Sequence, residues 1–167
     1  GVQTCALPIS ETRVRAVETL ARCAGELGMV GGQLLDMESE ERACTQQEIL
    51  DIQSRKTGAL IRAACLLGVL AGGGSEAQEQ AAGTFADHLG LAFQIRDDML
   101  DVIGDAQTLG KAVGVDECKN TFVRLYGMEA CQALVTEHTE LAVAALTPFA
   151  DAAWLQELAE SLTDRRF

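Results

Sequence analysis

The chain has 167 residues, of which 48% are apolar, and it carries a formal net charge of -12. This length fits one domain, and the apolar content is sufficient for a sizeable buried core. Because binding to nucleic acid requires clustered Lys and Arg side chains that neutralise phosphates, the acidic balance argues against nucleic acid as a partner.

The chain opens with a segment that does not join smoothly to any helical pattern. Residues 1–9, GVQTCALPI, match the translation of a common sequencing-adapter read. We therefore expect this segment to be non-native, and it is excluded from the reasoning about the fold. Native sequence is expected to begin at Ser10 or Glu11, in the middle of a gene.

Apolar residues recur at three- and four-residue spacing through most of the remaining sequence, and alternating apolar and polar runs are scarce. This pattern predicts an all-α protein without sheets. The first helical pattern covers residues 11–30 and is followed by a kink or turn at the glycine pair 31–32. The second covers residues 46–70 and ends at a run of glycines, which is typical of a helix C-terminus.

The third predicted helix is the one that carries the acidic residues discussed below. Ser75 is expected to be its N-cap, and it is expected to end at Ile103. The polar stretch 105–120 is predicted to be an ordered loop. Helical patterns then resume at about Thr121 and Met128, and Pro148 separates a final helix.

The location of the protein follows from what the sequence lacks. No apolar run reaches the roughly 18 residues that a membrane span requires, so a stable membrane anchor is not expected. The six cysteines form no CxxC pair, and no secretion signal opens the chain. These features predict reduced thiols and a cytoplasmic location.

Three aspartates, Asp97, Asp98 and Asp101, lie near the end of the third predicted helix. Helical spacing places the first two within one turn of Asp101, so the carboxylates are expected to converge. Negative charge at the C-terminal end of a helix is unfavourable unless a cation compensates it. Hard oxygen ligands of this kind suit Mg²⁺. Taken alone, however, the motif fits a solvated acidic face on an acidic protein better.

Two lysines are candidate phosphate ligands. Lys56 falls on the apolar stripe of the second predicted helix, where a lysine either extends to solvent or meets an anion in the interior. Lys111 lies in a glycine-containing loop, whose backbone and ammonium group could hold a phosphate. Each alone is more typical of a surface lysine. Together with an acidic Mg²⁺ site, they supply what a diphosphate leaving group requires.

Several motifs follow one another in the chain: GGQLLD at 31–36, KTGALIR at 56–62, GLAFQIRDDMLD at 90–101, GD at 104–105, TLGK at 108–111 and YGME at 126–129. In order and spacing they resemble the trans-isoprenyl diphosphate synthase (polyprenyl synthetase) family, in particular its bacterial farnesyl diphosphate synthase type. The resemblance implies the C-terminal part of the class I isoprenoid synthase helical bundle. Residues 10–167 would then be the C-terminal portion of a single prenyl synthase domain.

The resemblance also implies roles for individual side chains. The implied catalytic residues are Lys56, Thr57, Gln94 and Lys111. The implied substrate-binding residues are Lys56, Lys111 and Lys119. The implied metal ligands are Asp97, Asp98 and Asp101, which would bind Mg²⁺, with Mn²⁺ as an alternative ion. By this resemblance the lysines bind an allylic diphosphate, and the oxygens of Thr57 and Gln94 stabilise positive charge on the allylic carbon.

The implied reaction joins isopentenyl diphosphate to an allylic diphosphate, dimethylallyl or geranyl, and gives a short-chain product such as farnesyl diphosphate. Two alternatives to this reading of the motifs stay open. The first is a non-catalytic subunit of a heteromeric prenyl synthase, against which the intact DDMLD at 97–101 argues. The second is a terpene cyclase of the same fold, against which the FQ-x-x-DD-x-x-D and TLGK patterns argue.

The sequence departs from the family pattern in two ways. No first aspartate-rich motif and no basic site for isopentenyl diphosphate occur in these residues. The stretch 114–121 is about two residues shorter than the family pattern, which weakens the role given to Lys119. We therefore expect these 167 residues to be inactive alone. The resemblance also implies that the full-length protein forms a homodimer.

Overall fold

The computed structural model describes residues 10–109 and 120–165. These residues form α-helices with one π-helical turn, and no strand occurs in either described range. The elements are α1 (Glu11–Ala24), α2 (Met29–Ser39), α3 (Gln46–Gln53), η1 (Ser54–Gly58), α4 (Ala59–Ala71), α5 (Glu76–Leu109), α6 (Phe122–Tyr126), α7 (Met128–Ala145) and α8 (Ala153–Thr163). The predicted all-α fold is confirmed.

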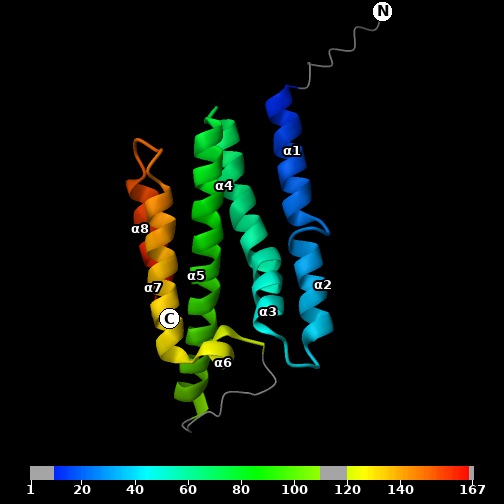
Figure 1. Ribbon diagram of the computed structural model, residues 1–167, viewed down its shortest axis with the longest axis vertical. Coiled ribbons are helices and arrows are strands. Elements are labelled where there is room, and N and C mark those ends of the chain that lie inside the picture. Colours follow the sequence, from blue (N-terminus) through cyan, green and yellow to red (C-terminus); the bar gives the residue numbers. More distant parts are fainter. Residues whose placement is uncertain (1–9, 110–119, 166–167) are drawn as a thin grey trace, which may run out of the picture.

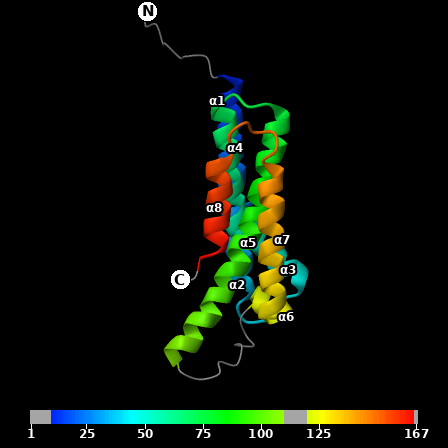
Figure 2. The same ribbon diagram turned by 90° about the vertical axis from the view of Figure 1, so that its left-hand side faces the viewer.

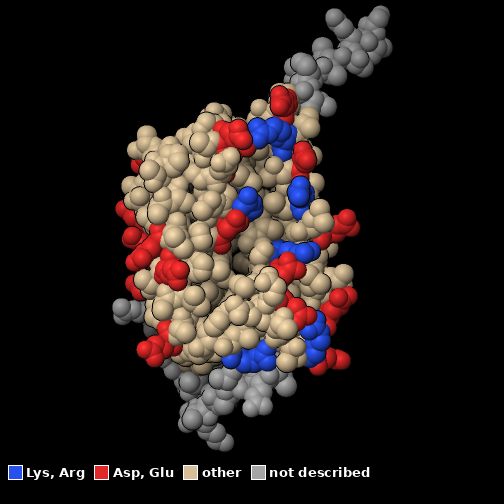
Figure 3. Space-filling model, viewed as in Figure 1, with Lys and Arg blue, Asp and Glu red and all other residues tan. Residues whose placement is uncertain are grey.

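The helices form a bundle around α5, which packs against α4 on one side and α7 on the other (Figure 1). The α1 and α2 helices follow one another along the outer side of α3 and α4, and α8 covers α7. The α5 helix has 34 residues, and its C-terminal end projects beyond the other helices (Figure 2). On the face shown in Figure 3, basic side chains lie interspersed with acidic ones.

Polar side chains at the helix starts explain where several helices begin. Thr45 and Glu48 form a reciprocal capping box at α3, with each side chain accepting a hydrogen bond from the other's backbone N–H. Ser75 and Gln78 make the equivalent pair of contacts at α5, which confirms the predicted N-cap. Thr121 caps α6 by accepting a hydrogen bond from the Arg124 N–H.

Two predicted helix ends are wrong, and one helix with correctly predicted bounds contains an unpredicted π-helical turn. The first helical pattern is interrupted at residues 25–28, and the glycine pair 31–32 lies inside α2 rather than in a turn. The stretch 46–70 is helical throughout but contains the π-helical turn η1. The α5 helix continues through Gly104 to Leu109, because a single glycine weakens a helix without ending it.

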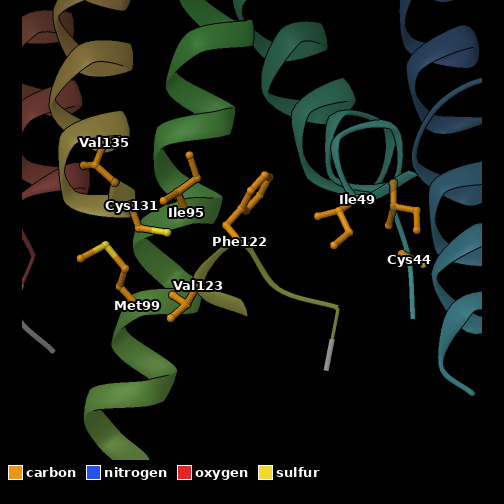
Figure 4. Close-up of a cluster of buried hydrophobic side chains, with 9 residues drawn as sticks. Cys44, Ile49, Ile95, Met99, Phe122, Val123, Cys131 and Val135 are labelled. Atoms are coloured by element: carbon orange, nitrogen blue, oxygen red, sulfur yellow. The ribbon is translucent and has the colours of Figure 1, made fainter. Parts of the chain in front are cut away.

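The buried side chains form two clusters at different heights of the bundle. The first includes Ile49, Ile95 and Phe122, and Figure 4 shows the Phe122 ring lying between Ile95 of α5 and Ile49 of α3. The second joins Phe85 and Leu89 of α5 to residues of α7 and α8. Phe122 therefore fixes the short α6 helix onto α5, at the level where α5 carries its aspartates.

Cys23, Cys44, Cys65 and Cys131 are free thiols. Within the described ranges, no helix combines the length and the hydropathy that crossing a membrane would require.

Two glycines bring neighbouring helices close to η1. A Cβ atom at Gly32 of α2 would lie 2.4 Å from the backbone nitrogen of Lys56. A Cβ atom at Gly90 of α5 would lie 3.2 Å from the Cα atom of Gly58. The η1 turn is thus held between α2 and α5 at distances that a side chain at Gly32 would prevent.

We expect Gly32→Ala to destabilise the protein by about 1–3 kcal/mol, because the added methyl group forces the backbones of α2 and η1 apart. Gly68→Ala is the matched control: Gly68 also lies inside a helix, but a Cβ atom there meets nothing within 4 Å. That variant should be stabilised by about 0.5–1 kcal/mol, since alanine favours a helix. Urea unfolding followed by circular dichroism measures both, and equal changes would contradict the close-approach argument.

Candidate active site

The site is built where η1, α2 and α5 meet. The η1 turn covers Ser54–Gly58, and π-helical turns of this kind occur frequently at functional sites. It carries Lys56 and Thr57 side by side. The Lys56 ammonium donates to Asp36 of α2, with 2.6 Å between Nζ and Oδ2. Of the two environments considered for this lysine, contact with an anion is the one observed, at a side-chain exposure of 36%.

A chain of hydrogen bonds connects η1 to α5 and α6. The Thr57 hydroxyl donates to the Gln94 carbonyl oxygen at 3.1 Å. The Gln94 amide nitrogen donates to Asp98 Oδ1 at 3.2 Å. The Phe122 backbone N–H donates to Asp98 Oδ2 at 2.8 Å. These contacts join Thr57 to Gln94 and also fix the rotamer of Asp98.

Asp98 is a buried carboxylate, with 7% of its surface exposed. Burial raises its pKa from the ordinary value of 3.8 to about 6, although the hydrogen bonds from Phe122 and Gln94 oppose the shift. The nearby carboxylates of Asp101 and Asp97 raise the pKa further. Nearby positive charge would relieve this cost, and a metal ion is one source of it.

The other two aspartates are more accessible. Asp101 is exposed. Asp97 is half exposed and forms an ion pair with Arg165, with 2.7 Å between Asp97 Oδ1 and a guanidinium nitrogen of Arg165. The Arg165 guanidinium also lies over the Phe93 ring, 4.2 Å from its centroid. Arg96 anchors this C-terminal segment by donating two hydrogen bonds to the Arg165 carbonyl oxygen.

The expected convergence of all three carboxylates is not found. Within the parts of the chain that the structure describes, no group of three or more His, Cys, Asp or Glu side chains is arranged to hold a metal ion. The reason is that Asp98, adjacent to Asp97 on the helix, points inward to α6. Asp97 and Asp101, four residues apart, share a face of α5. Two accessible carboxylates fit Mg²⁺, which takes one or two from protein and completes its shell with water and phosphate oxygens.

An apolar cavity of about 910 Å³ adjoins these polar groups. Thr57 and Phe93 belong to its lining, at the level of the hydrogen-bonded chain. Further along, the lining consists mainly of apolar side chains of α4, α5 and α8, including Ile61, Leu89 and Leu158. The arrangement suits an amphiphilic molecule whose polar end meets Thr57 and whose hydrocarbon part enters the cavity.

Comparison with known proteins decides the family. The family model described as polyprenyl synthetase matches residues 3–158. The chain belongs to the polyprenyl synthetase family. It is 41% identical to a farnesyl diphosphate synthase of Geobacillus stearothermophilus over 132 residues, which cover 78% of this chain and 44% of that relative. The chain therefore spans less than half the length of this curated relative.

Solved structures of similar proteins agree with the fold. The FPP/GFPP synthase of Zymomonas mobilis superposes with a TM-score of 0.80 at 30% identity, covering 90% of this chain and 51% of that one. A geranyltransferase of Helicobacter pylori, complexed with magnesium and isoprenyl diphosphate, gives a TM-score of 0.73 at 30% identity, covering 95% and 53%. The polyprenyl synthetase fold is thus shared over nearly the whole of this chain.

The predicted site residues are partly brought together. The structure joins Thr57 to Gln94, while the ammonium of Lys56, the residue before Thr57 in η1, is held by Asp36. Asp97 and Asp98 lie one turn further along α5 than Gln94. Lys111 and Lys119 lie outside the described residues, as does the predicted non-native segment 1–9, so these assignments stay predictions.

The sequence analysis missed Asp36 as a neighbour of the site. A signal for Asp36 was present, because it lies four residues after Gly32 in the GGQLLD motif and so shares a helix face with it. The contact of Arg165 with Asp97 depends on how the C-terminal segment crosses α5.

Asp98→Asn is expected to stabilise the metal-free protein above pH 6, by about 1–3 kcal/mol. The folded protein holds a proton on Asp98 up to a pKa of about 6, whereas the unfolded chain loses it near 3.8. Stability therefore falls as the pH rises through this interval, and asparagine removes the cost. Thermal unfolding at pH 7.5 and pH 3.5 checks the sign: the gain should be present only at the higher pH. Exposed Asp101→Asn is the control, and an equal gain there would contradict a burial effect.

Proposed function

We propose that the protein of which this chain is a part is a prenyltransferase that joins isopentenyl diphosphate to dimethylallyl or geranyl diphosphate. The observation that carries this proposal is the hydrogen bond between Gln94 and Thr57, a residue that lines the apolar cavity. Family membership and the farnesyl diphosphate synthase relatives support it. The product is proposed to be a short chain such as farnesyl diphosphate.

The side chains divide the work between binding and ionisation. Lys56 donates to the oxygens of the allylic diphosphate and stabilises the negative charge that grows as the C–O bond breaks. The oxygens of Thr57 and Gln94 face the allylic carbon and stabilise its positive charge. The double bond of isopentenyl diphosphate then attacks this carbon, and loss of a proton to the released diphosphate gives the longer chain.

Asp97, Asp98 and Asp101 are the proposed metal ligands, with Asp98 turning outward or acting through its neighbours. Mg²⁺, or Mn²⁺ in its place, would supply a Lewis acid that neutralises the charge of the leaving diphosphate. Arg165 holds Asp97 in the structure and would have to share or leave that carboxylate. Lys111 and Lys119 are proposed as further diphosphate ligands. A cytoplasmic location is also proposed.

To test this proposal, the complete gene product is expressed, including whatever precedes Ser10. The assay follows the elongation of each allylic substrate with isopentenyl diphosphate. We expect Mg²⁺-dependent formation of a longer prenyl diphosphate, identified by chromatography. Asp97→Ala should lower kcat by roughly 100-fold or more through loss of metal-assisted charge neutralisation. Asp51→Ala, which removes an aspartate outside this site, is the control.

Two results would contradict the proposal, and each would indicate a different function. Turnover of an allylic diphosphate alone, without incorporation of isopentenyl diphosphate, indicates a cyclase. A well-folded protein with no turnover, which restores activity to a partner synthase, indicates a non-catalytic subunit.

The complete protein is also proposed to be a homodimer. Apolar side chains along α1 and α2 are strongly exposed, including Val17 at 70% and Leu34 at 56%. A continuous apolar face of this kind marks an interaction surface. A second copy of the protein is its proposed occupant.

Val17→Glu combined with Leu34→Glu should convert the dimer to a monomer, because two charges per copy would be buried without partners. Light scattering during gel filtration measures the mass of each species. Leu141→Glu is the matched control, since Leu141 is an exposed leucine on α7, at 42% exposure. A double variant that remains dimeric would place the interface elsewhere.

A further inference from the structure

Asp36 and Lys56 form an ion pair between two elements that are far apart in sequence. The distance between Lys56 Nζ and Asp36 Oδ2 is 2.6 Å, and the side chains are 36% and 30% exposed. Gly32 makes this contact possible, because its missing side chain lets α2 approach the backbone of η1. Asp36 lies four residues later on the same face of α2, so its carboxylate is carried to the Lys56 ammonium.

We propose that Asp36 is a positioning residue that directs the Lys56 ammonium toward the diphosphate of the allylic substrate. This inference rests on the proposed function, in which Lys56 binds that diphosphate. A lysine side chain has many rotamers, and an unpaired ammonium would lose this freedom only when substrate binds. The contact with Asp36 fixes the ammonium beforehand.

The ammonium group keeps the capacity to bind substrate while it is held. It has three N–H donors, and Asp36 is the partner observed for it in the structure. The remaining donors can serve phosphate oxygens. Removing the carboxylate would leave the positive charge in place, so attraction of the diphosphate would persist, but its direction would be lost.

A purely structural role for the pair would predict a lower unfolding temperature when Asp36 is removed. Partly exposed ion pairs contribute little to folding stability, so loss of Asp36 should leave the unfolding temperature nearly unchanged. The Asp51–Arg55 pair provides a matched comparison, with 2.9 Å between Oδ1 and Nε and side-chain exposures of 43% and 37%. It links two residues of one continuous helical stretch, and Asp51 borders a different cavity together with His88 and His138.

The experiment uses the complete gene product and measures kcat and KM for the allylic diphosphate in Asp36→Ala, Lys56→Ala and the double variant. We expect Asp36→Ala to lower kcat roughly 10- to 100-fold, because misplaced groups cost rate. KM should stay within about twofold, since uniform binding is retained. In the Lys56→Ala background, the Asp36 substitution should have no further effect on kcat.

The variants Asp36→Asn and Asp36→Glu test whether misfolding explains the loss of kcat in Asp36→Ala. The asparagine keeps a neutral acceptor and should lose less activity than alanine, while glutamate should restore part of the rate through its carboxylate. Asp51→Ala should leave kcat within about twofold of wild type.

Losses in kcat that multiply in the double variant would overturn the proposal, as would a rise in KM accompanied by a lower unfolding temperature. Wild-type protein without condensation activity would refute the proposed function and this inference with it. Wild-type activity with multiplicative losses would refute this inference alone.

Discussion

The close approach of α2 and α5 to η1 is the constraint on which the site depends. Gly32 and Gly90 remove the side chains that would otherwise keep these helices apart. Four residues after each glycine, on the same helix face, stands a polar residue that contacts η1: Asp36 meets Lys56, and Gln94 meets Thr57. Backbone proximity thus brings short polar side chains within hydrogen-bonding distance.

The same region contains a carboxylate, that of Asp98, whose charge is unfavourable because it is buried. Asp98 is buried beneath α6, and its carboxylate ties the Phe122 N–H to Gln94. The hydrogen bonds do not fully offset the loss of hydration, which is why its pKa is raised to about 6. Such a group in a polyprenyl synthetase is better explained by a function than by stability, because an uncharged residue of similar shape would avoid this cost.

The sequence was sufficient for the helical class and for most helices, because caps such as Thr45 and Ser75 and the apolar spacing act locally. It also selected Lys56, Thr57 and Gln94 as candidate site residues, through motifs rather than through geometry. It could not predict that Asp98 turns inward or that Arg165 reaches Asp97, since both depend on packing between distant segments. The π-helical turn was hidden for a similar reason: its composition is that of an ordinary helix.

The α5 helix connects the apolar and polar parts of the site through its periodicity. Phe85, Leu89 and Phe93 repeat every four residues and line the cavity. Gln94 and Asp97 lie next to the end of this row, so the helix changes from apolar to polar character within one turn. A ligand that follows α5 would therefore meet mainly hydrocarbon surface along the cavity and the hydrogen-bonded pair Thr57 and Gln94 near one end. This division requires no movement of the helix, because a single rigid element sets the distance between the two environments.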